Sequence, residues 1–320
     1  MTRLTPTLMI VALFGVALSA APAQAQLART YVSSSGSDLN NCDRLTPCRT
    51  FQHAHDQTLA EGEITVLDPG GYGSVTINRA ISIINDGVGE AGVLVSGGAT
   101  GIGIAAGATD AVSLRGLTVK GIGFGGGTGI TFFNGGSLTI ENCAVRSLDG
   151  TMGAGFGIVF AATNTSTLVV SNTVVTDNLL DGIIILSEGA NIAVRAILNR
   201  VEARNNGGSG IVADGVFGTG TLDVTVVDSV AANNAGAGID ARSLTNAAVT
   251  KMMVVRSRAA YNQLGISASS ASTTVRLTGS AVTGNAVGVS ATSGTVLSYG
   301  DNQINANTGG ETVPPPLGKK

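Results

Sequence analysis

A glycine followed by an aliphatic residue recurs through most of the chain, at intervals of 23 to 28 residues. The step begins at Gly101, Gly129, Gly157, Gly182, Gly210, Gly238, Gly265 and Gly288. The next residue is Ile in seven copies and Val in the eighth, and a second apolar residue follows two positions later. Alternate residues of a strand point to the same face. Each repeat therefore predicts a short strand with two inward side chains, which stacked repeats would bury in one continuous core.

An asparagine precedes the glycine by three or four residues in the later repeats. The copies are Asn178, Asn206, Asn234, Asn262 and Asn285. Asparagine tolerates left-handed backbone, and its amide can bond to neighbouring main chain or to a stacked copy of itself. The recurrence predicts that the same bend is aligned from one repeat to the next.

Three strands fit into each repeat. In the repeat from Gly182 we expect them at residues 183–186, 192–194 and 197–203, and in the repeat from Gly210 at residues 211–213, 222–226 and near 229–232. The repeat region as a whole is predicted to span residues 63–310.

The segments before the repeats differ in character. Residues 1–25 have a basic start, an apolar run from Leu8 to Ala20 and the small-residue end Ala23-Gln24-Ala25, which together predict a cleaved signal peptide and a secreted or periplasmic protein. Residues 26–62 predict a strand, a loop with two cysteines and a helix that caps the stack, with Thr46 as N-cap and Gly62 as its end. Residues 311–320 contain three consecutive prolines and predict an unstructured tail.

Composition narrows the class of protein. Of the 320 residues 43% are hydrophobic and 12% charged, and 46 are Gly, which fits short strands with tight turns rather than disorder. The formal net charge of −3 argues against nucleic acid as the main partner. After residue 25 no apolar stretch is long enough to predict a membrane span.

The cysteines and histidines are few. In an exported protein Cys42 and Cys48 are expected to form a disulfide, whereas Cys143 is expected to be a buried apolar residue. His53 and His55 are two residues apart on the predicted helix and would point in different directions, so no metal site is predicted.

Several segments resemble a known family. They are Tyr31-Val32-Ser33, Pro47-Cys48-Arg49-Thr50-Phe51-Gln52, Asp68-Pro69-Gly70-Gly71-Tyr72 and the Asn-x-x-x-Gly-Ile repeats. Together they resemble right-handed parallel β-helix proteins of the pectate-lyase-like superfamily. The resemblance implies an all-β solenoid with three short parallel strands per coil, here with an N-terminal capping helix. It leaves the activity open, because the superfamily contains lyases, hydrolases, adhesins and phage tailspikes.

One group of charged residues is the candidate catalytic site. Asp214 and Arg242 occupy the same outward position of neighbouring repeats, and Asp240 lies two residues before Arg242. They could form a surface salt bridge, or they could be part of a lyase site in which the aspartates hold Ca²⁺ and Arg242 accepts a proton. Two carboxylates are too few for a calcium site, so we expect no cofactor unless the chain is a lyase. The resemblance implies a Gly-His-Gly motif for a hydrolase, but no histidine follows His55.

Apolar residues at outward positions form the candidate binding surface. Val159, Ile184 and Val212 are expected to line one outer face, with Leu186 beside them. They could be exposed as a contact surface or covered by a loop such as residues 163–167.

These observations favour an exported β-helix protein that presents a rigid binding surface to a polysaccharide or a cell envelope, without an evident catalytic site. The alternatives are a polysaccharide lyase-like enzyme and a purely structural or adhesive solenoid.

Overall fold

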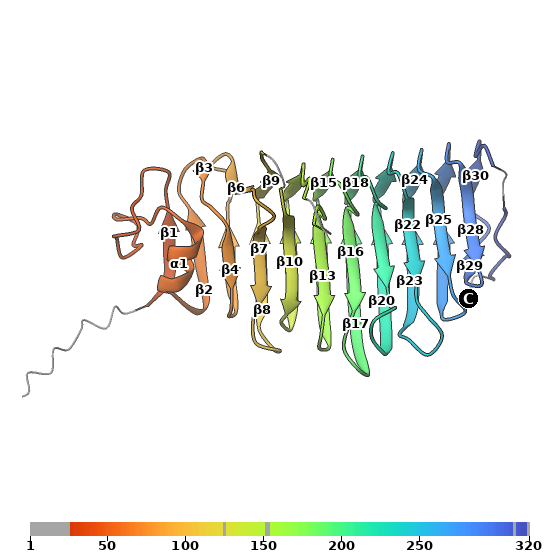
Figure 1. The fold of residues 1–320 in the computed structure, drawn as a ribbon, viewed down its shortest axis with the longest axis horizontal. Coiled ribbons are helices and arrows are strands. Elements are labelled where there is room, and N and C mark those ends of the chain that lie inside the picture. The colour runs from red at the N-terminus through yellow and green to blue at the C-terminus, as the bar shows by residue number, and fades with distance from the viewer. Residues whose placement is uncertain (1–25, 124–125, 151–153, 310–311, 319–320) are drawn as a thin grey trace, which may run out of the picture.

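The computed structural model describes residues 26–123, 126–150, 154–309 and 312–318 as a long parallel solenoid (Figure 1). The predicted signal peptide, residues 1–25, lies outside the described residues. The chain coils through three sheets in turn, and every pair of neighbouring strands is parallel. The predicted all-β, right-handed parallel β-helix with three short strands per coil is confirmed.

Sheet 1 has 11 strands. They are β1 (Leu27–Val32), β2 (Thr58–Val66), β5 (Ile81–Ile84), β8 (Ala111–Arg115), β11 (Ser137–Glu141), β14 (Ser166–Ser171), β17 (Ile192–Asn199), β20 (Gly220–Val227), β23 (Val249–Val255), β26 (Thr273–Thr278) and β29 (Thr295–Ser298).

Sheet 2 has 10 strands. They are β3 (Gly70–Gly71), β6 (Ala91–Val95), β9 (Leu117–Gly121), β12 (Ala144–Arg146), β15 (Val174–Thr176), β18 (Glu202–Arg204), β21 (Val230–Ala232), β24 (Arg258–Ala260), β27 (Ala281–Thr283) and β30 (Gln303–Asn305).

Sheet 3 has nine strands and carries the Gly-aliphatic repeat. They are β4 (Val75–Ile77), β7 (Thr100–Ala105), β10 (Thr128–Asn134), β13 (Ile158–Ala162), β16 (Ile183–Ser187), β19 (Ile211–Asp214), β22 (Ala237–Arg242), β25 (Leu264–Ser269) and β28 (Val287–Thr292).

The predicted core ladder lies on the inner face of sheet 3. Ile183 pairs with Ile211 and Ile211 with Ile239, and all three are buried. The second ladder is also buried, and its bulky end contains a stacked ring pair, Phe132 and Phe160, with centroids 4.2 Å apart. Ala291 is the exception, because β28 is the last strand of sheet 3 and no further coil covers it.

The asparagines stack at the bend between sheets 2 and 3, as predicted. Asn206 Oδ1 accepts the backbone and side-chain N–H groups of Asn178, and Asn234 Oδ1 accepts those of Asn206, with amide-to-amide distances of 2.9 Å. The left-handed residue is the one before each asparagine, such as Asn233 with φ of 55°. The stacked amides therefore satisfy the backbone of a bend that the preceding residue creates.

The N-terminal end is covered by a helix that differs from the predicted one. Helix α1 (Phe51–Gln57) has Thr50 as its N-cap instead of Thr46, because Cys48 is still in extended backbone and bridges to Val32. The helix ends before Gly62, since β2 already begins at Thr58. No helix among the described residues is long and apolar enough to cross a bilayer.

Two further boundaries differ from the expectation. Residues 192–199 form one strand, β17, because the bend falls at Arg200, which has φ of 53°. At the C-terminus, residues 312–318 are not free: Ser298 bridges to Pro316, and the backbone N–H of Leu317 donates to the Ser298 carbonyl. The described part of the predicted unstructured tail therefore lies against β29.

Candidate functional site

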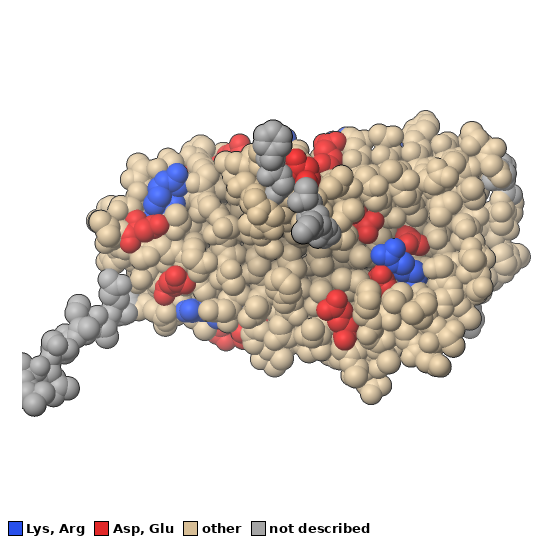
Figure 2. All heavy atoms as spheres, viewed as in Figure 1, with Lys and Arg blue, Asp and Glu red and all other residues tan. Residues whose placement is uncertain are grey.

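The outer face of sheet 3 concentrates its charge at one place. The described residues of its nine strands include three charged ones, Asp214 at the end of β19 and Asp240 and Arg242 in β22. Arg242 pairs with Asp214 in the register of the two strands, and its Nε lies 2.7 Å from Asp214 Oδ2. Its Nη1 lies 3.8 Å from Asp240 Oδ2. Figure 2 shows acidic side chains gathered around basic atoms over the region between β16 and β22.

A fourth charged residue, Asp181, belongs to the same group. It directly precedes Gly182, one coil before Asp214, and its Oδ1 accepts the backbone N–H of Ser209 at 2.5 Å. Its carboxylate interacts electrostatically with Arg242 and Asp214. Asp181 was not predicted from the sequence, because the candidate charged residues were found at positions after the repeat glycine. The residue before the glycine also varies between coils, as Asp181, Ser209 and Ala237, so no recurrent pattern marks it. Asp181, Asp214, Asp240 and Arg242 are called the acidic site below.

Burial sets the electrostatics of the acidic site. Burial raises the pKa of Asp240, and the hydrogen bond from Ser267 and the attraction of Arg242 only partly oppose this. Burial likewise raises the pKa of Asp181, against the hydrogen bond from Ser209. For Arg242 burial works toward a lower pKa, but Asp214, Asp240 and Asp181 together raise it. Two carboxyls of the site are therefore easier to protonate than a free aspartate.

The group is more than a surface salt bridge. The Asp214 side chain is 5% exposed, that of Asp240 is 12% exposed and that of Arg242 is 37% exposed. Loss of Arg242 alone would leave a nearly buried carboxylate without its partner, which is far costlier than loss of an exposed ion pair.

The predicted apolar binding strip is not an exposed surface. Val212 is completely buried and Ile184 is 5% exposed, whereas Val159 and Leu186 are half-buried. Val212 lies beside Asp240 in the register and two residues before Asp214, and Arg242 reaches both carboxylates. The apolar residues therefore lie beside the acidic site on the same outer face of the sheet.

The loop of residues 163–167, a possible cover for the apolar strip, is held by other coils. In residues 163–167, the Asn164 amide donates to the carbonyls of Ala108 and Gly135, so this loop is fixed to the preceding coils.

Two loops form an edge next to the acidic site. Asp214 Oδ1 accepts the backbone N–H of Val216, which starts the loop that carries Phe217. The neighbouring loop begins directly after Arg242 and carries Leu244. Phe217 is 68% exposed and Leu244 is 55% exposed. In Figure 1 the loops along this edge of the solenoid extend furthest between β16 and β23.

The donor atoms of the site suit a polar organic ligand better than a resident metal. A calcium ion takes about six to eight oxygen ligands. The site offers three carboxylates, of which Asp214 is bound to Arg242 and Asp181 to the Ser209 backbone. By contrast, carboxylates accept hydrogen bonds from hydroxyl groups, and the Arg242 guanidinium is a planar donor.

Comparisons with known proteins agree with the fold. The family model described as a right handed beta helix region matches residues 72–308. A sequence comparison with curated proteins gave no significant match.

Three solved structures are similar over most of the chain. Pectate lyase Pel9A has a TM-score of 0.54 and 17% identity, over 89% of this chain and 81% of that one. The A-module of the Azotobacter vinelandii mannuronan C-5 epimerase AlgE4 has a TM-score of 0.57 and 19% identity, over 78% and 70%. A rhamnogalacturonan lyase has a TM-score of 0.55 and 15% identity, over 84% and 75%. The chain therefore belongs to the right-handed β-helix family, whose fold it shares with polysaccharide lyases and an epimerase.

Proposed function

We propose that this is an exported β-helix protein that binds a polysaccharide across the outer face of sheet 3, at the acidic site. The observation that carries the proposal is the concentration of charge at this site, on a sheet whose other described strand residues are uncharged. Residues 1–25, which predict a signal peptide, support export.

The chemistry of the acidic site supports a sugar ligand. Asp240 and Asp181 supply acceptors for hydroxyl groups, and the partly exposed Arg242 supplies donors. The half-buried Leu186 beside Asp214 gives the site some apolar surface, and Phe217 offers an exposed ring at its edge. Binding sites commonly combine an apolar lining with a few placed polar groups.

The relatives support a polysaccharide as the ligand class. The similar structures are named as a pectate lyase, a mannuronan epimerase and a rhamnogalacturonan lyase. Their shared fold alone does not carry their substrates over to this chain. Polysaccharide binding is therefore proposed from the acidic site, and the relatives narrow the choice of ligands to test.

Electrophoresis in gels that contain single polysaccharides tests the proposal. The panel should include neutral, uronate-containing and amino-sugar polymers, because three carboxylates and one arginine favour a neutral or cationic sugar. We expect at least one polymer to retard the parent protein. If no polymer changes its mobility and a glycan array also shows no binding, the proposed function is wrong.

A lyase-like enzyme is the second candidate. The raised pKa values of Asp181 and Asp240 beside an arginine favour it, because perturbed carboxyls cluster at catalytic sites. In such a reaction a base removes the proton next to a uronate carboxyl, and the glycosidic oxygen leaves as a double bond forms.

Ultraviolet detection of unsaturated uronates separates the two candidates. Under the binding proposal the parent protein releases none from any acidic polymer. A product signal that is lost in Arg242→Ala, with the fold retained by circular dichroism, would establish the enzyme instead.

A further inference from the structure

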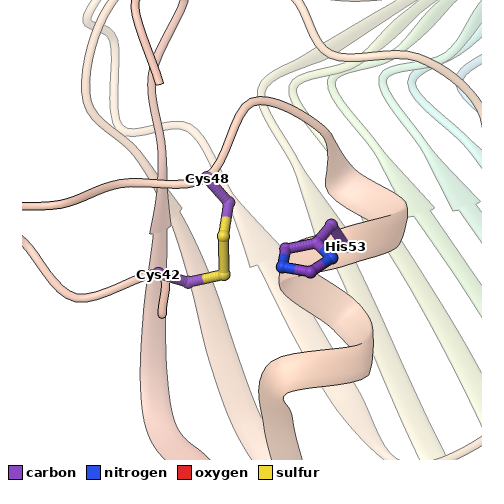
Figure 3. A group of neighbouring side chains, drawn as sticks. All are labelled: Cys42, Cys48 and His53. Carbon is purple, nitrogen blue, oxygen red and sulfur yellow. A yellow bond between two sulfur atoms is a disulfide. The ribbon is translucent and has the colours of Figure 1, made fainter. Parts of the chain in front are cut away.

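Three possible metal ligands converge at the N-terminal cap, away from the acidic site. The sulfur atoms of Cys42 and Cys48 and a ring nitrogen of His53 all lie within 4.8 Å of one another. Cys42 and Cys48 form a disulfide with their Cα atoms 4.7 Å apart, and both are completely buried. Figure 3 shows the His53 ring next to the sulfur pair, on the side of helix α1 that faces it.

The surrounding structure holds these groups in place. Cys48 bridges to Val32 of β1, and the Cys42 carbonyl accepts the backbone N–H of Tyr31 on the same strand. His53 is fixed through its backbone N–H, which donates to the N-cap Thr50. Two neighbouring loop segments and a helix therefore present the three ligands toward one point.

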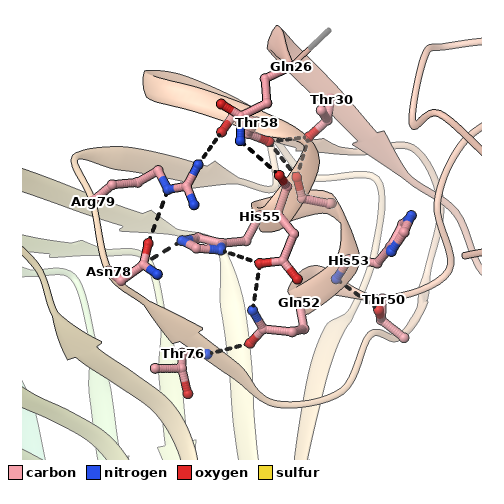
Figure 4. Close-up of polar contacts among 12 residues, drawn as sticks. Gln26, Thr30, Thr50, Gln52, His53, His55, Thr58, Thr76, Asn78 and Arg79 are labelled. Carbon is pink, nitrogen blue, oxygen red and sulfur yellow. Dashed lines mark hydrogen bonds and ion pairs between the residues drawn. The ribbon is translucent and has the colours of Figure 1, made fainter. Parts of the chain in front are cut away.

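The two histidines of the helix differ in their surroundings. His55 is buried, with Nδ1 3.0 Å from Asp56 Oδ1 and Nε2 accepting the backbone N–H of Asn78 (Figure 4). His53 is half-buried, and its Nε2 lies 3.4 Å from the Asn40 carbonyl oxygen, at the long end of hydrogen-bond distance. The contact of His55 with Asn78 is also 3.4 Å, but His55 is completely buried and is held by Asp56 at 3.0 Å. The His53 imidazole can therefore turn to a ligand at lower cost than that of His55.

We propose that the reduced form of this loop binds one Zn²⁺ through Cys42, Cys48 and His53, and that the disulfide and the metal are alternative states of the same site. Zinc prefers thiolate sulfur and imidazole nitrogen in tetrahedral geometry, and two thiolates with one imidazole provide three of its four ligands. Water can supply the fourth. The sulfurs cannot serve both states, because a disulfide has no thiolate to offer.

A phosphine can reduce the Cys42–Cys48 disulfide to the two thiols. The phosphine attacks one sulfur and the S–S bond breaks; water then supplies the oxygen of the phosphine oxide and the protons of the two thiols. Zn²⁺ binding then releases two protons, one from each thiol, as the two Zn–S bonds form. Zinc and an oxidant thus compete for the same pair of sulfurs.

The test uses the full mature chain, reduced with a phosphine and desalted without oxygen. Co²⁺, which reports tetrahedral thiolate ligation by its visible absorption, and then Zn²⁺ are titrated into reduced and oxidised protein. We expect one Co²⁺ per reduced chain, displaced by Zn²⁺, and no thiolate spectrum from oxidised protein. His53→Ala should weaken binding by at least about tenfold, since even supporting ligand contacts are worth that much.

His55→Gln is the matched control, because it changes the other histidine of the same helix and should bind Co²⁺ like the parent. A second measurement covers the case in which reduction loosens the loop: Zn²⁺ should slow maleimide labelling of Cys42 and Cys48, and less so in His53→Ala. The proposal is wrong if reduced and oxidised protein bind equally, if His53→Ala binds like the parent, or if Zn²⁺ leaves the labelling rate unchanged.

Discussion

Arg242 lies one coil after Asp214 at the same position of the repeat, and this register brings their side chains into contact. The contact could be predicted from the sequence, because the repeat length fixes which residues are neighbours. The burial of the group could not be predicted. It depends on the side chains that cover Val212 and on Asp181, a residue that no repeated pattern marks. The same limit left the exposure of Ile184 and Val212 open in the sequence: an outward position is exposed only if its neighbours leave it so, and here both are buried.

A neutral replacement of Asp240 should stabilise the protein at neutral pH. Burial raises the pKa of Asp240 in the folded state above its unfolded value of about 3.9. Between the two pKa values the folded protein binds more protons, so this carboxyl makes stability fall as pH rises through that window. Asp240→Asn cannot ionise, so its melting temperature should match the parent at acid pH and exceed it at pH 7.

Asp228→Asn is the control for this prediction. Asp228 has a lowered pKa because Arg256 binds it, so its contribution is present at neutral pH and is lost as pH falls. This variant should show the opposite sign, with a slightly lower melting temperature at pH 7. An Asp240→Asn variant that melts below the parent at pH 7 would mean that the attraction of Arg242 outweighs burial.

At the scale of elements, the stacked asparagines are the main polar support of the solenoid. Each buried amide oxygen accepts the backbone and side-chain N–H groups of the asparagine one coil before, and each amide nitrogen donates to the side-chain oxygen one coil after. The stack therefore links neighbouring coils. The recurrence of Asn in the sequence was sufficient to predict this stack. It was not sufficient to place the left-handed residue: Asp177 and Asn205 suit left-handed backbone, but Tyr261 at the same position does not mark it.

Asn234→Ala should destabilise the protein strongly. The change removes the acceptor of two Asn206 N–H groups and the donor to Asn262 Oδ1. Each buried polar group left without a partner costs about 1–3 kcal/mol, so we expect a loss of at least about 2 kcal/mol in urea unfolding. Asn233→Gly, at the neighbouring exposed left-handed position, should stay within about 1 kcal/mol of the parent. Equal stability of the two variants would show that the stack is not a major support.

The loop after β19 should contribute to ligand binding through Phe217. Aromatic packing is worth about 0.5–1.5 kcal/mol, so Phe217→Ala should weaken binding of the polysaccharide found in the panel about two- to tenfold in calorimetry. Because the ring is exposed, the melting temperature should not change. Phe133→Ala removes a half-exposed ring of β10 on the same sheet and should bind like the parent. If both variants bind equally well, Phe217 is not part of the binding surface.

At the scale of the whole molecule, the repeat predicted the architecture because a solenoid coil contacts mainly its neighbours. The core ladders and the sheet order follow from that regularity. The ends and loops could not be predicted in this way, because they interrupt the repeat. Examples are the start of the helix at Phe51 and the contact of residues 312–318 with β29. The proposed binding site also lies where the pattern is interrupted, since the acidic site holds the charged residues among the described strand residues of sheet 3.

Two Asp–Arg pairs of the chain allow one decisive comparison. Asp214 with Arg242 and Asp228 with Arg256 both join residues 28 apart in neighbouring coils, but the first pair is at the acidic site and the second is exposed at another edge. The double variants Asp214→Asn/Arg242→Gln and Asp228→Asn/Arg256→Gln remove both charges and make the same change in side-chain size at each pair.

Calorimetric titration of both double variants, with the polysaccharide that retards the parent, tests whether the acidic site binds that polysaccharide. We predict that the first variant keeps its circular dichroism spectrum but loses affinity at least about tenfold, a difference of about 1.4 kcal/mol, while the second binds like the parent. A folded Asp214→Asn/Arg242→Gln protein with the dissociation constant of the parent would show that the acidic site is not the binding site.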